Sequence, residues 1–267
     1  MPQTRQRSAS SKISKPPVVA TPDETIQALL HRAARRSAAV PISKMFLQQG
    51  SGRFRIPGPL AELVRRRDER ALDLLLLAHA TATADPYDIT EAAAVWARTL
   101  DLGSSESSLT AVSKAFRRLS ERQLVARTRV GRRLQVTLLE PDGSGAPYRH
   151  PSSTSAGYLK LSFDYWVEGW HRRLGLPGKA FLLIALSLAD AFPLPAERGP
   201  EWYGISADTI ERGVADLEAH GLLQVDRVSK VAPLAPEGYT IENRYTLRAP
   251  FGPRGVRAKG APEVADT

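Results

Sequence analysis

The stretch from residue 107 to residue 140 changes its apolar spacing partway along, and this change constrains the fold more than any other feature. Apolar residues recur every three or four positions from Leu109 to Leu119, as on one buried face of a helix. From Val125 to Leu138 the pattern alternates, as in two strands that turn near Gly131. The stretch therefore predicts a helix packed on a core and followed by a β-hairpin.

The same pattern occurs a second time, 98 positions further along the chain, as the step from Leu124 to Leu222 shows. The matched apolar positions of the two helices are Leu109, Val112, Phe116, Leu119 and Leu124 with Ala207, Ile210, Val214, Leu217 and Leu222. In the same alignment Ser108 corresponds to Ser206 and Gln123 to Gly221. The repeat indicates an internal duplication of about ninety residues, each copy being one structural unit.

Composition shifts divide the chain into five segments. We expect a basic arm and a short helix over 1–55, with the arm disordered and Thr21 capping the helix. A first unit spans 56–140, and the Pro-, Gly- and Ser-rich interval 141–157 is predicted to be a linker. A second unit spans 158–252, and 253–267 is predicted to be a disordered tail. The predicted fold class is mainly α with small β-ribbons (α+β).

Each predicted unit has helices, a turn, a further helix that follows serines, and then a two-stranded ribbon. This order, together with SSLTAVSKAFRRLSERQLVARTRVGRRLQVTLLE and ISADTIERGVADLEAHGLLQVDRV, resembles the winged-helix variant of helix-turn-helix proteins. Two such units in tandem resemble plasmid replication initiators and some transcription regulators, including proteins of actinobacterial mobile elements. The resemblance implies that the third helix of a unit reads DNA and that its ribbon is the wing.

Net charge points to an anionic partner and separates the two units. The chain carries +9, which favours nucleic acid. Residues 107–133 hold eight basic residues and one acidic residue, a net +7, whereas 204–230 hold three basic and five acidic residues, a net −2. The first unit is therefore predicted to bind double-stranded DNA, because an acidic helix in the second would be repelled by phosphates.

The predicted DNA-binding residues lie on the helix over 107–122 and on the ribbon around Gly131. Their hydroxyl, ammonium and guanidinium groups donate hydrogen bonds to phosphates and base edges. They are Ser107, Ser108, Thr110, Ser113, Lys114, Arg117, Arg118, Arg122, Arg127, Arg129, Arg132 and Arg133. Either Lys114 or Arg117 is suited to reading guanine.

The second unit is predicted mainly to dimerise or to contact a partner. Its aromatic residues Trp166, Trp170, Trp202 and Tyr203 either anchor an interface or fill the core. A second DNA contact through Ser206, Thr209 and Arg212 is the alternative. A second copy of the chain and the replication or transcription machinery are therefore expected as further partners.

Motifs of catalysis and of membrane insertion are absent from the sequence. There are no cysteines, and the five histidines do not have metal-site spacing, so we expect no metal, no cofactor and no enzymatic activity. The absence of cysteine suits a reducing cytoplasm, where we expect the protein to be. The longest apolar run, over 180–192, is too short to span a bilayer and contains Asp190, so we expect no membrane partner.

The function predicted from these observations is sequence-specific binding of duplex DNA by a transcriptional regulator. The first alternative is a replication initiator of a plasmid or integrative element. The second is a winged-helix adaptor that binds protein, an interpretation that the charge contrast favours only for the second unit.

Overall fold

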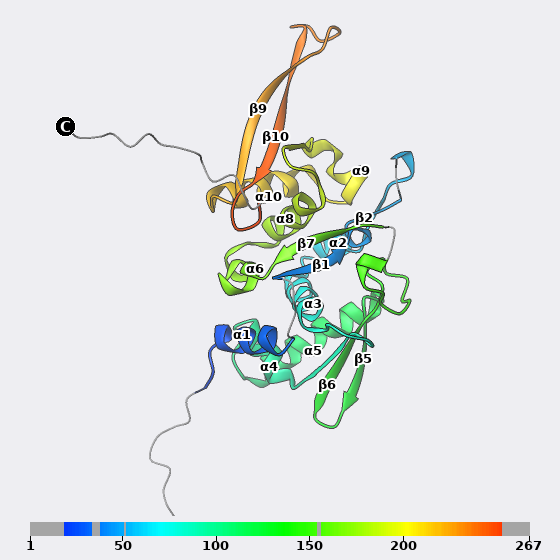
Figure 1. Cartoon of the computed structure of the whole chain (residues 1–267), viewed down its shortest axis with the longest axis vertical. Helices are drawn as coiled ribbons and strands as arrows, with labels where there is room; N and C mark the ends of the chain where they lie inside the picture. The colour runs from blue at the N-terminus through cyan, green and yellow to red at the C-terminus, as the bar shows by residue number, and fades with distance from the viewer. Residues whose placement is uncertain (1–18, 34–37, 51, 154–155, 253–267) are drawn as a thin grey trace, which may run out of the picture.

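A computed structural model describes residues 19–33, 38–50, 52–153 and 156–252. In these residues, helices alternate with small antiparallel sheets, so the fold is α+β (Figure 1). The predicted disordered arm up to residue 18 and the predicted tail over 253–267 lie outside the described residues. Within the described part of the chain, each helix is too short or too polar to cross a membrane.

The first half of the chain contains five α-helices and six strands among the residues that the structure describes. In chain order these are α1 (Pro22–Arg32), β1 (Ala39–Ser43), β2 (Gln48–Gln49), β3 (Ile56–Pro57), α2 (Leu60–Arg65), α3 (Glu69–Thr81), β4 (Asp88–Glu91), α4 (Ala93–Thr99), α5 (Glu106–Glu121), β5 (Val125–Val130) and β6 (Arg133–Leu138). The predicted cap of α1 is confirmed: the Thr21 hydroxyl accepts a hydrogen bond from the Glu24 backbone N–H, and the Glu24 carboxylate accepts one from the Thr21 N–H.

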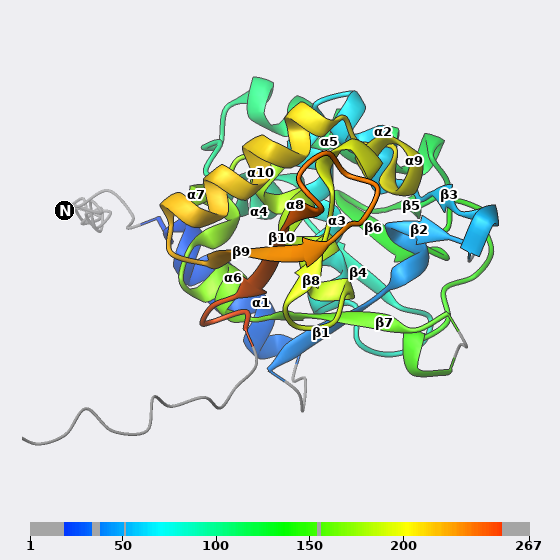
Figure 2. The same cartoon turned by 90° about the horizontal axis from the view of Figure 1, so that it is seen from above.

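The described part of the second half begins with a strand and ends with a long hairpin. Its helices and strands are β7 (Tyr158–Ser162), α6 (Asp164–Val167), α7 (Trp170–Arg173), α8 (Leu176–Ser187), β8 (Phe192–Pro193), α9 (Gly199–Tyr203), α10 (Ala207–Ala219), β9 (Leu223–Val231) and β10 (Tyr239–Leu247). Viewed from above, α10 runs across the molecule next to α8 (Figure 2). The approach is close because Gly213 has no side chain: a Cβ there would lie 2.6 Å from the Pro177 carbonyl oxygen.

The two halves repeat one order of elements. A buried helix, a short strand, a short helix, a long helix and a hairpin follow one another from α3 to β6 and again from α8 to β10. The sheets also have equivalent strand orders, β4-β6-β5 and β8-β10-β9, and every pairing is antiparallel. The shared topology is what a duplication of one structural unit produces.

The 98-residue correspondence holds for the C-terminal part of the long helices and fails at their first turn. Val112 and Leu119 of α5 are buried, as are their counterparts Ile210 and Leu217 of α10. However, α5 has 16 residues and α10 has 13. The N-caps are Ser105 and Ser206, so Ser108, which the offset aligns with Ser206, lies inside the first turn of α5 and does not cap it.

The junction after each long helix has the same backbone conformation in both halves. Gln123 has φ +57° and Gly221 has φ +69°, so both residues are left-handed. Glycine adopts this conformation without a steric penalty, whereas glutamine incurs one. Glutamine at position 123 therefore makes this junction energetically less favourable than glycine would, but it does not change the backbone conformation.

The N-terminal segment joins the two halves. Strand β1 pairs antiparallel with β7, from Ala39 opposite Ser162 to Ser43 opposite Tyr158, and its apolar residues Val40 and Ile42 are buried. Part of the segment 1–55, predicted from sequence as an arm and a short helix, thus forms a sheet with the first strand of the second half.

A buried ion cluster also joins the halves. The Lys179 ammonium on α8 lies 2.8 Å from both carboxylate oxygens of Asp73 and 2.8 Å from a carboxylate oxygen of Glu69, both on α3. The exposed fraction of the Lys179 side chain is 2%. One contiguous cluster of buried apolar residues runs through both halves around these contacts.

The interval 141–157, predicted as a linker, contains packed residues. Tyr148 is buried, with its ring centroid 4.8 Å from that of Tyr87 and 5.4 Å from that of His79. The buried Glu140 carboxylate accepts hydrogen bonds from the backbone N–H and the guanidinium of Arg149. These contacts hold the middle of the interval against the first half.

Candidate nucleic-acid interface

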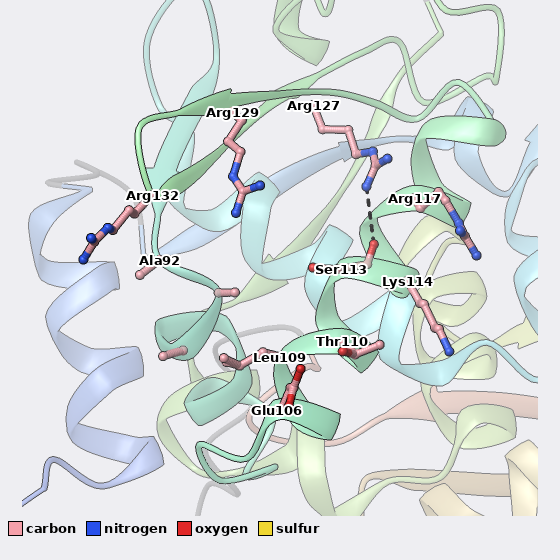
Figure 3. A pocket seen from close by; sticks show the side chains of 12 residues that line it. Ala92, Glu106, Leu109, Thr110, Ser113, Lys114, Arg117, Arg127, Arg129 and Arg132 are labelled. Atoms are coloured by element: carbon pink, nitrogen blue, oxygen red, sulfur yellow. Dashed lines mark hydrogen bonds between the residues drawn. The ribbon is translucent and has the colours of Figure 1, made fainter.

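A basic groove of about 620 Å³ lies between α5, strand β5 and the start of α4 (Figure 3). Side chains from both the long helix and the hairpin surround it, and Ala92 to Ala94 form a wall of small residues. The remaining lining residues are Glu106, Leu109, Thr110, Ser113, Lys114, Arg117, Arg127, Arg129 and Arg132. Seven of the twelve predicted DNA-binding residues are therefore brought together in one place.

Helix α5 presents its polar residues to this groove because its other face is fixed in the core. Val112, Phe116 and Leu119 are buried at spacings of four and three. Thr110, Ser113, Lys114 and Arg117 consequently lie on the exposed side. Leu109 was expected to face inward, but it is only partly buried and lines the groove.

The hairpin arginines face the groove because of their register. Arg127 lies opposite Val136 and Arg129 opposite Leu134 on the neighbouring strand, and residues opposite one another share a face. Since Val136 is buried, this is the face of the sheet that packs toward the helices. The Arg127 guanidinium also donates a hydrogen bond of 3.4 Å to the Ser113 carbonyl oxygen, which ties the hairpin to α5 (Figure 3).

The groove carries a positive charge that the protein leaves largely unpaired. Five basic side chains line it against the single carboxylate of Glu106. Arg117 lies 3.6 Å from Glu121 in an exposed pair. Lys114, Arg129 and Arg132 form no ion pair with another described residue. Like charges held this close repel one another, so a bound anion would stabilise the arrangement.

Arg118 and Arg122 have a different environment. The Arg118 guanidinium donates two hydrogen bonds of 2.6 Å to the two Asp68 carboxylate oxygens, and Arg122 lies 3.4 Å from the same carboxylate. Asp68 is buried, and its hydrogen bond raises the pKa of Arg118. The two arginines thus join α5 to the residue before α3, in a second depression that Glu62, Arg66, Arg67 and Glu121 also line. The structure does not bring them together with the basic groove.

We expect replacement of Arg118 by Met to lower the free energy of unfolding by about 1–2 kcal/mol, because Asp68 stays buried with only its weaker partner. Arg117 is the matched control, since it is the neighbouring arginine and its ion pair is exposed. Arg117→Met is expected to change stability by no more than about 0.5 kcal/mol. Urea denaturation of both variants measures the difference, and equal losses would contradict the structural role of Arg118.

Three further predicted residues lie outside the groove. Ser108 is buried, and its hydroxyl donates to the Leu102 carbonyl oxygen, because α5 begins at Glu106 and this serine points back to the preceding turn. Ser107 is exposed, and its hydroxyl is 2.8 Å from that of Ser105. Arg133 lies opposite Val130, so it is on the hairpin face away from Arg127 and Arg129.

The corresponding residues of the second unit are held by local contacts. The Ser206 hydroxyl accepts a hydrogen bond from the Thr209 backbone N–H, and the Thr209 hydroxyl contacts Ser206 and Arg212. The Arg212 guanidinium lies 2.8 Å from the Asp208 carboxylate one turn earlier. Ser206, Thr209 and Arg212 therefore form a cap and an ion pair at the start of α10, and the charge of the arginine is compensated.

The aromatic residues of the second unit lie mainly in the core. Trp166, Trp170 and Tyr203 are buried, so the alternative in which they fill the core is confirmed and the interface alternative is wrong for them. Trp202 is partly buried, and the Arg55 guanidinium lies 4.7 Å from its ring centroid. A cation over the ring face interacts with the π electrons, so Trp202 is also engaged within the chain.

Sequence reasoning missed the small-residue wall of the groove and the partner of Arg118. The run EAAAV over 91–95 was a detectable signal, since small side chains allow another molecule to come close to the backbone. No local signal connected Asp68 with an arginine fifty residues later.

Comparisons of the chain with protein-family models, curated proteins and solved structures found no match.

Proposed function

We propose that the protein binds double-stranded DNA through the groove between α5 and the β5–β6 hairpin, and that each half is a winged-helix unit. The observation that carries the proposal is the convergence of five basic side chains from a helix and a hairpin beside a wall of alanines. The element order and the strand order β4-β6-β5 support the winged-helix assignment.

In this arrangement α5 enters the major groove and the hairpin follows the sugar–phosphate backbone. Lys114 and Arg117, one turn apart on the exposed face of α5, donate to base edges or to phosphates. Arg129 and Arg132 neutralise phosphates and carry no sequence information of their own. Arg127 positions the hairpin through Ser113 and adds charge to the groove.

The biological role that we propose is transcriptional regulation, which needs only binding to an operator. Replication initiation on a plasmid or integrative element is the second candidate, favoured by the presence of two units of the same topology in one chain. The two roles differ in the fate of the duplex once the protein is bound. An initiator exposes single-stranded DNA at its site, which permanganate footprinting detects, whereas a simple regulator leaves the duplex closed.

The direct test is a titration of the whole chain with labelled duplex DNA at several salt concentrations. The whole chain is the appropriate material because β1 pairs with β7 and one core runs through both halves. We expect the logarithm of the affinity to fall with the logarithm of the salt concentration, with a slope of about four to five. Absence of binding at low salt would overturn the proposal.

Two substitutions separate base reading from backbone contact. Lys114→Ala is expected to lower the preference for a selected site over random duplex by about 1–3 kcal/mol. Arg132→Ala is expected to weaken all duplexes equally and to reduce the salt slope by about one. Arg212→Ala serves as the control in α10 and should leave both quantities unchanged, because Asp208 already compensates this arginine. If Lys114→Ala and Arg132→Ala both bind like the original chain, the groove is not the DNA site.

A further inference from the structure

The hairpin formed by β9 and β10 exposes apolar side chains that the second unit leaves uncovered. Figure 1 shows the two strands extending away from the helices. The exposed fractions are 81% for Val231, 64% for Ile241 and 44% for Tyr239, and Leu234 at the tip is fully exposed. Such a cluster in one ribbon indicates an interaction surface.

The exposed residues continue a face that is buried nearer the body. Tyr239 lies opposite Val231, and side chains alternate between faces along each strand, so Tyr239 and Ile241 share a face with the buried Tyr245. Among the described residues, the core covers this face at Tyr245 and nothing covers it at Tyr239 and Ile241. The outer part of the hairpin is therefore available to a partner.

The charge of the hairpin does not suit DNA. Over 226–244 the strands and tip carry Arg227, Lys230 and Arg244 against Asp226, Glu237 and Glu242, a net charge of zero. The β5–β6 hairpin, over 125–138, carries four arginines and no acidic residue. Since affinity for phosphate backbones comes from cationic side chains, the β9–β10 hairpin is suited to a protein partner.

The outer edge of β9 supplies the hydrogen-bonding groups for such a partner. Strand β9 lies at the end of the order β8-β10-β9. The Leu222 carbonyl oxygen accepts from the Arg248 N–H at 2.8 Å, and the Ala232 N–H donates to the Gly238 carbonyl oxygen at 2.9 Å. The backbone N–H and C=O groups of the even-numbered residues of β9 therefore form hydrogen bonds with β10. Those of the odd-numbered residues from Val225 to Val231 point away from β10, toward the open edge of the sheet.

This edge is complementary to itself in one register. When two copies of β9 pair antiparallel around Val228, the outward-pointing Arg227 and Val225 lie opposite Ser229 and Val231 of the second copy. The same register places Asp226 opposite Lys230 of the second copy, twice in the pair, and opposite charges on facing strands attract. Centring on Arg227 instead would put two arginines opposite one another, and centring on Ser229 would leave both charges without a counterpart.

From this geometry we infer that the occupant of the edge is a second copy of this chain, bound through β9 around Val228. The three-stranded sheet of each copy then continues into a six-stranded sheet, and the exposed apolar faces of the two hairpins become adjacent. The interface is isologous, so it closes at two copies. Because the β5–β6 hairpin lies at the opposite end of the molecule (Figure 1), the two basic grooves remain exposed in the pair.

A single cysteine tests the register, because the chain has no cysteine of its own. Val228 and Val228 of the second copy would form a pair without hydrogen bonds, with Cα atoms about 4.5 Å apart, which a disulfide spans. We expect Val228→Cys to form a covalent dimer on mild oxidation, about tenfold faster or more than Thr240→Cys, whose two copies would lie about 20 Å apart, three strands across and four residues along the sheet. Equal rates, or no cross-linked dimer, would overturn the assigned register.

A proline substitution tests the contribution of the edge to association. The Ser229 N–H points outward, so Ser229→Pro removes a donor to the second copy and leaves the bonds between β9 and β10 intact. Sedimentation equilibrium is expected to show the original chain and the control Ser229→Ala at twice the mass of 29.2 kDa, and Ser229→Pro as a monomer whose far-UV circular dichroism spectrum is unchanged. An original chain that stays monomeric up to high micromolar concentration, or a dimeric Ser229→Pro, would refute the inference.

Discussion

Replacing Lys179 by Met is expected to lower the free energy of unfolding at neutral pH by about 3–5 kcal/mol, because a buried carboxylate loses its counter-charge. The ammonium group lies 2.8 Å from both oxygens of Asp73. Burial already raises the pKa of Asp73 to about 6, and Lys179 opposes that rise. Without Lys179 the pKa of Asp73 rises further, and its charged form becomes still more costly.

The sign of the pH dependence follows from that pKa. Asp73 has a higher pKa in the folded chain than its ordinary value of 3.8, so the folded state binds the proton more tightly and stability falls as pH rises from about 4 through 6. The defect of Lys179→Met is therefore expected to shrink below pH 6, where Asp73 is protonated. His171, whose pKa is lowered to about 4 chiefly by burial, has the opposite dependence. Lys179 contributes to that lowering, so Lys179→Met also moves the pKa of His171 toward its ordinary value, which further reduces the defect at acidic pH.

Urea denaturation at pH 7 and pH 5 measures both effects. Lys160→Met is the control because Lys160 is an exposed lysine on β7, and its loss should change stability by no more than about 0.5 kcal/mol. The double variant Asp73→Leu with Lys179→Met is expected to recover part of the loss, since it removes the unpaired charge together with its partner. A single variant as stable as the control, or an effect independent of pH, would contradict this account of the cluster.

Replacing Lys114, Arg129 and Arg132 together by Gln is expected to lower duplex affinity by about two to three orders of magnitude near 0.1 M salt and to reduce the salt slope by about three. These three side chains line the groove and form no ion pair with a described residue. Each phosphate that they neutralise releases a counterion, and this release is the main source of the affinity.

A second triple variant separates the groove from the net charge of the chain. Arg172, Arg198 and Arg212 are exposed and paired with Asp23, Glu201 and Asp208. Their replacement by Gln removes the same three charges from other surfaces. Fluorescence anisotropy with one labelled duplex should show a small loss for this control. If both variants lose affinity equally, the binding is a property of net charge and the groove is not the site.

Local sequence patterns were sufficient to predict the long helix and the hairpin of each unit, but not that β4 or β8 adds a third strand to the hairpin. The spacing of Val112 and Leu119 determines which face of α5 is buried, and the alternation at Arg127 and Arg129 determines which side of β5 they share. Both depend on periodicities of the backbone itself. The corresponding buried pairs, such as Leu119 and Leu217, showed the duplication for the same reason.

Contacts between distant segments were not predicted from the sequence. Arg118 and Arg122 fit the periodicity of an exposed basic face, yet Asp68 binds both of them. Ser108 resembled a helix N-terminus, although the helix starts at Glu106 and buries it. Helical periodicity assigns a residue to a face of its own helix, but it does not say which charge from another element lies against that face.

For this protein, the sequence by itself determined the long helix and hairpin of each unit, the repeat and the surplus of basic residues around α5 and β5. Only the tertiary structure decided which of those residues converge on one groove, and which are held by Asp68. It also decided that β1 pairs with β7 and that Lys179 joins the halves through Asp73. The physical reason is range: periodicity acts between neighbours along the chain, whereas ion pairs and strand pairing depend on segments that only folding brings together.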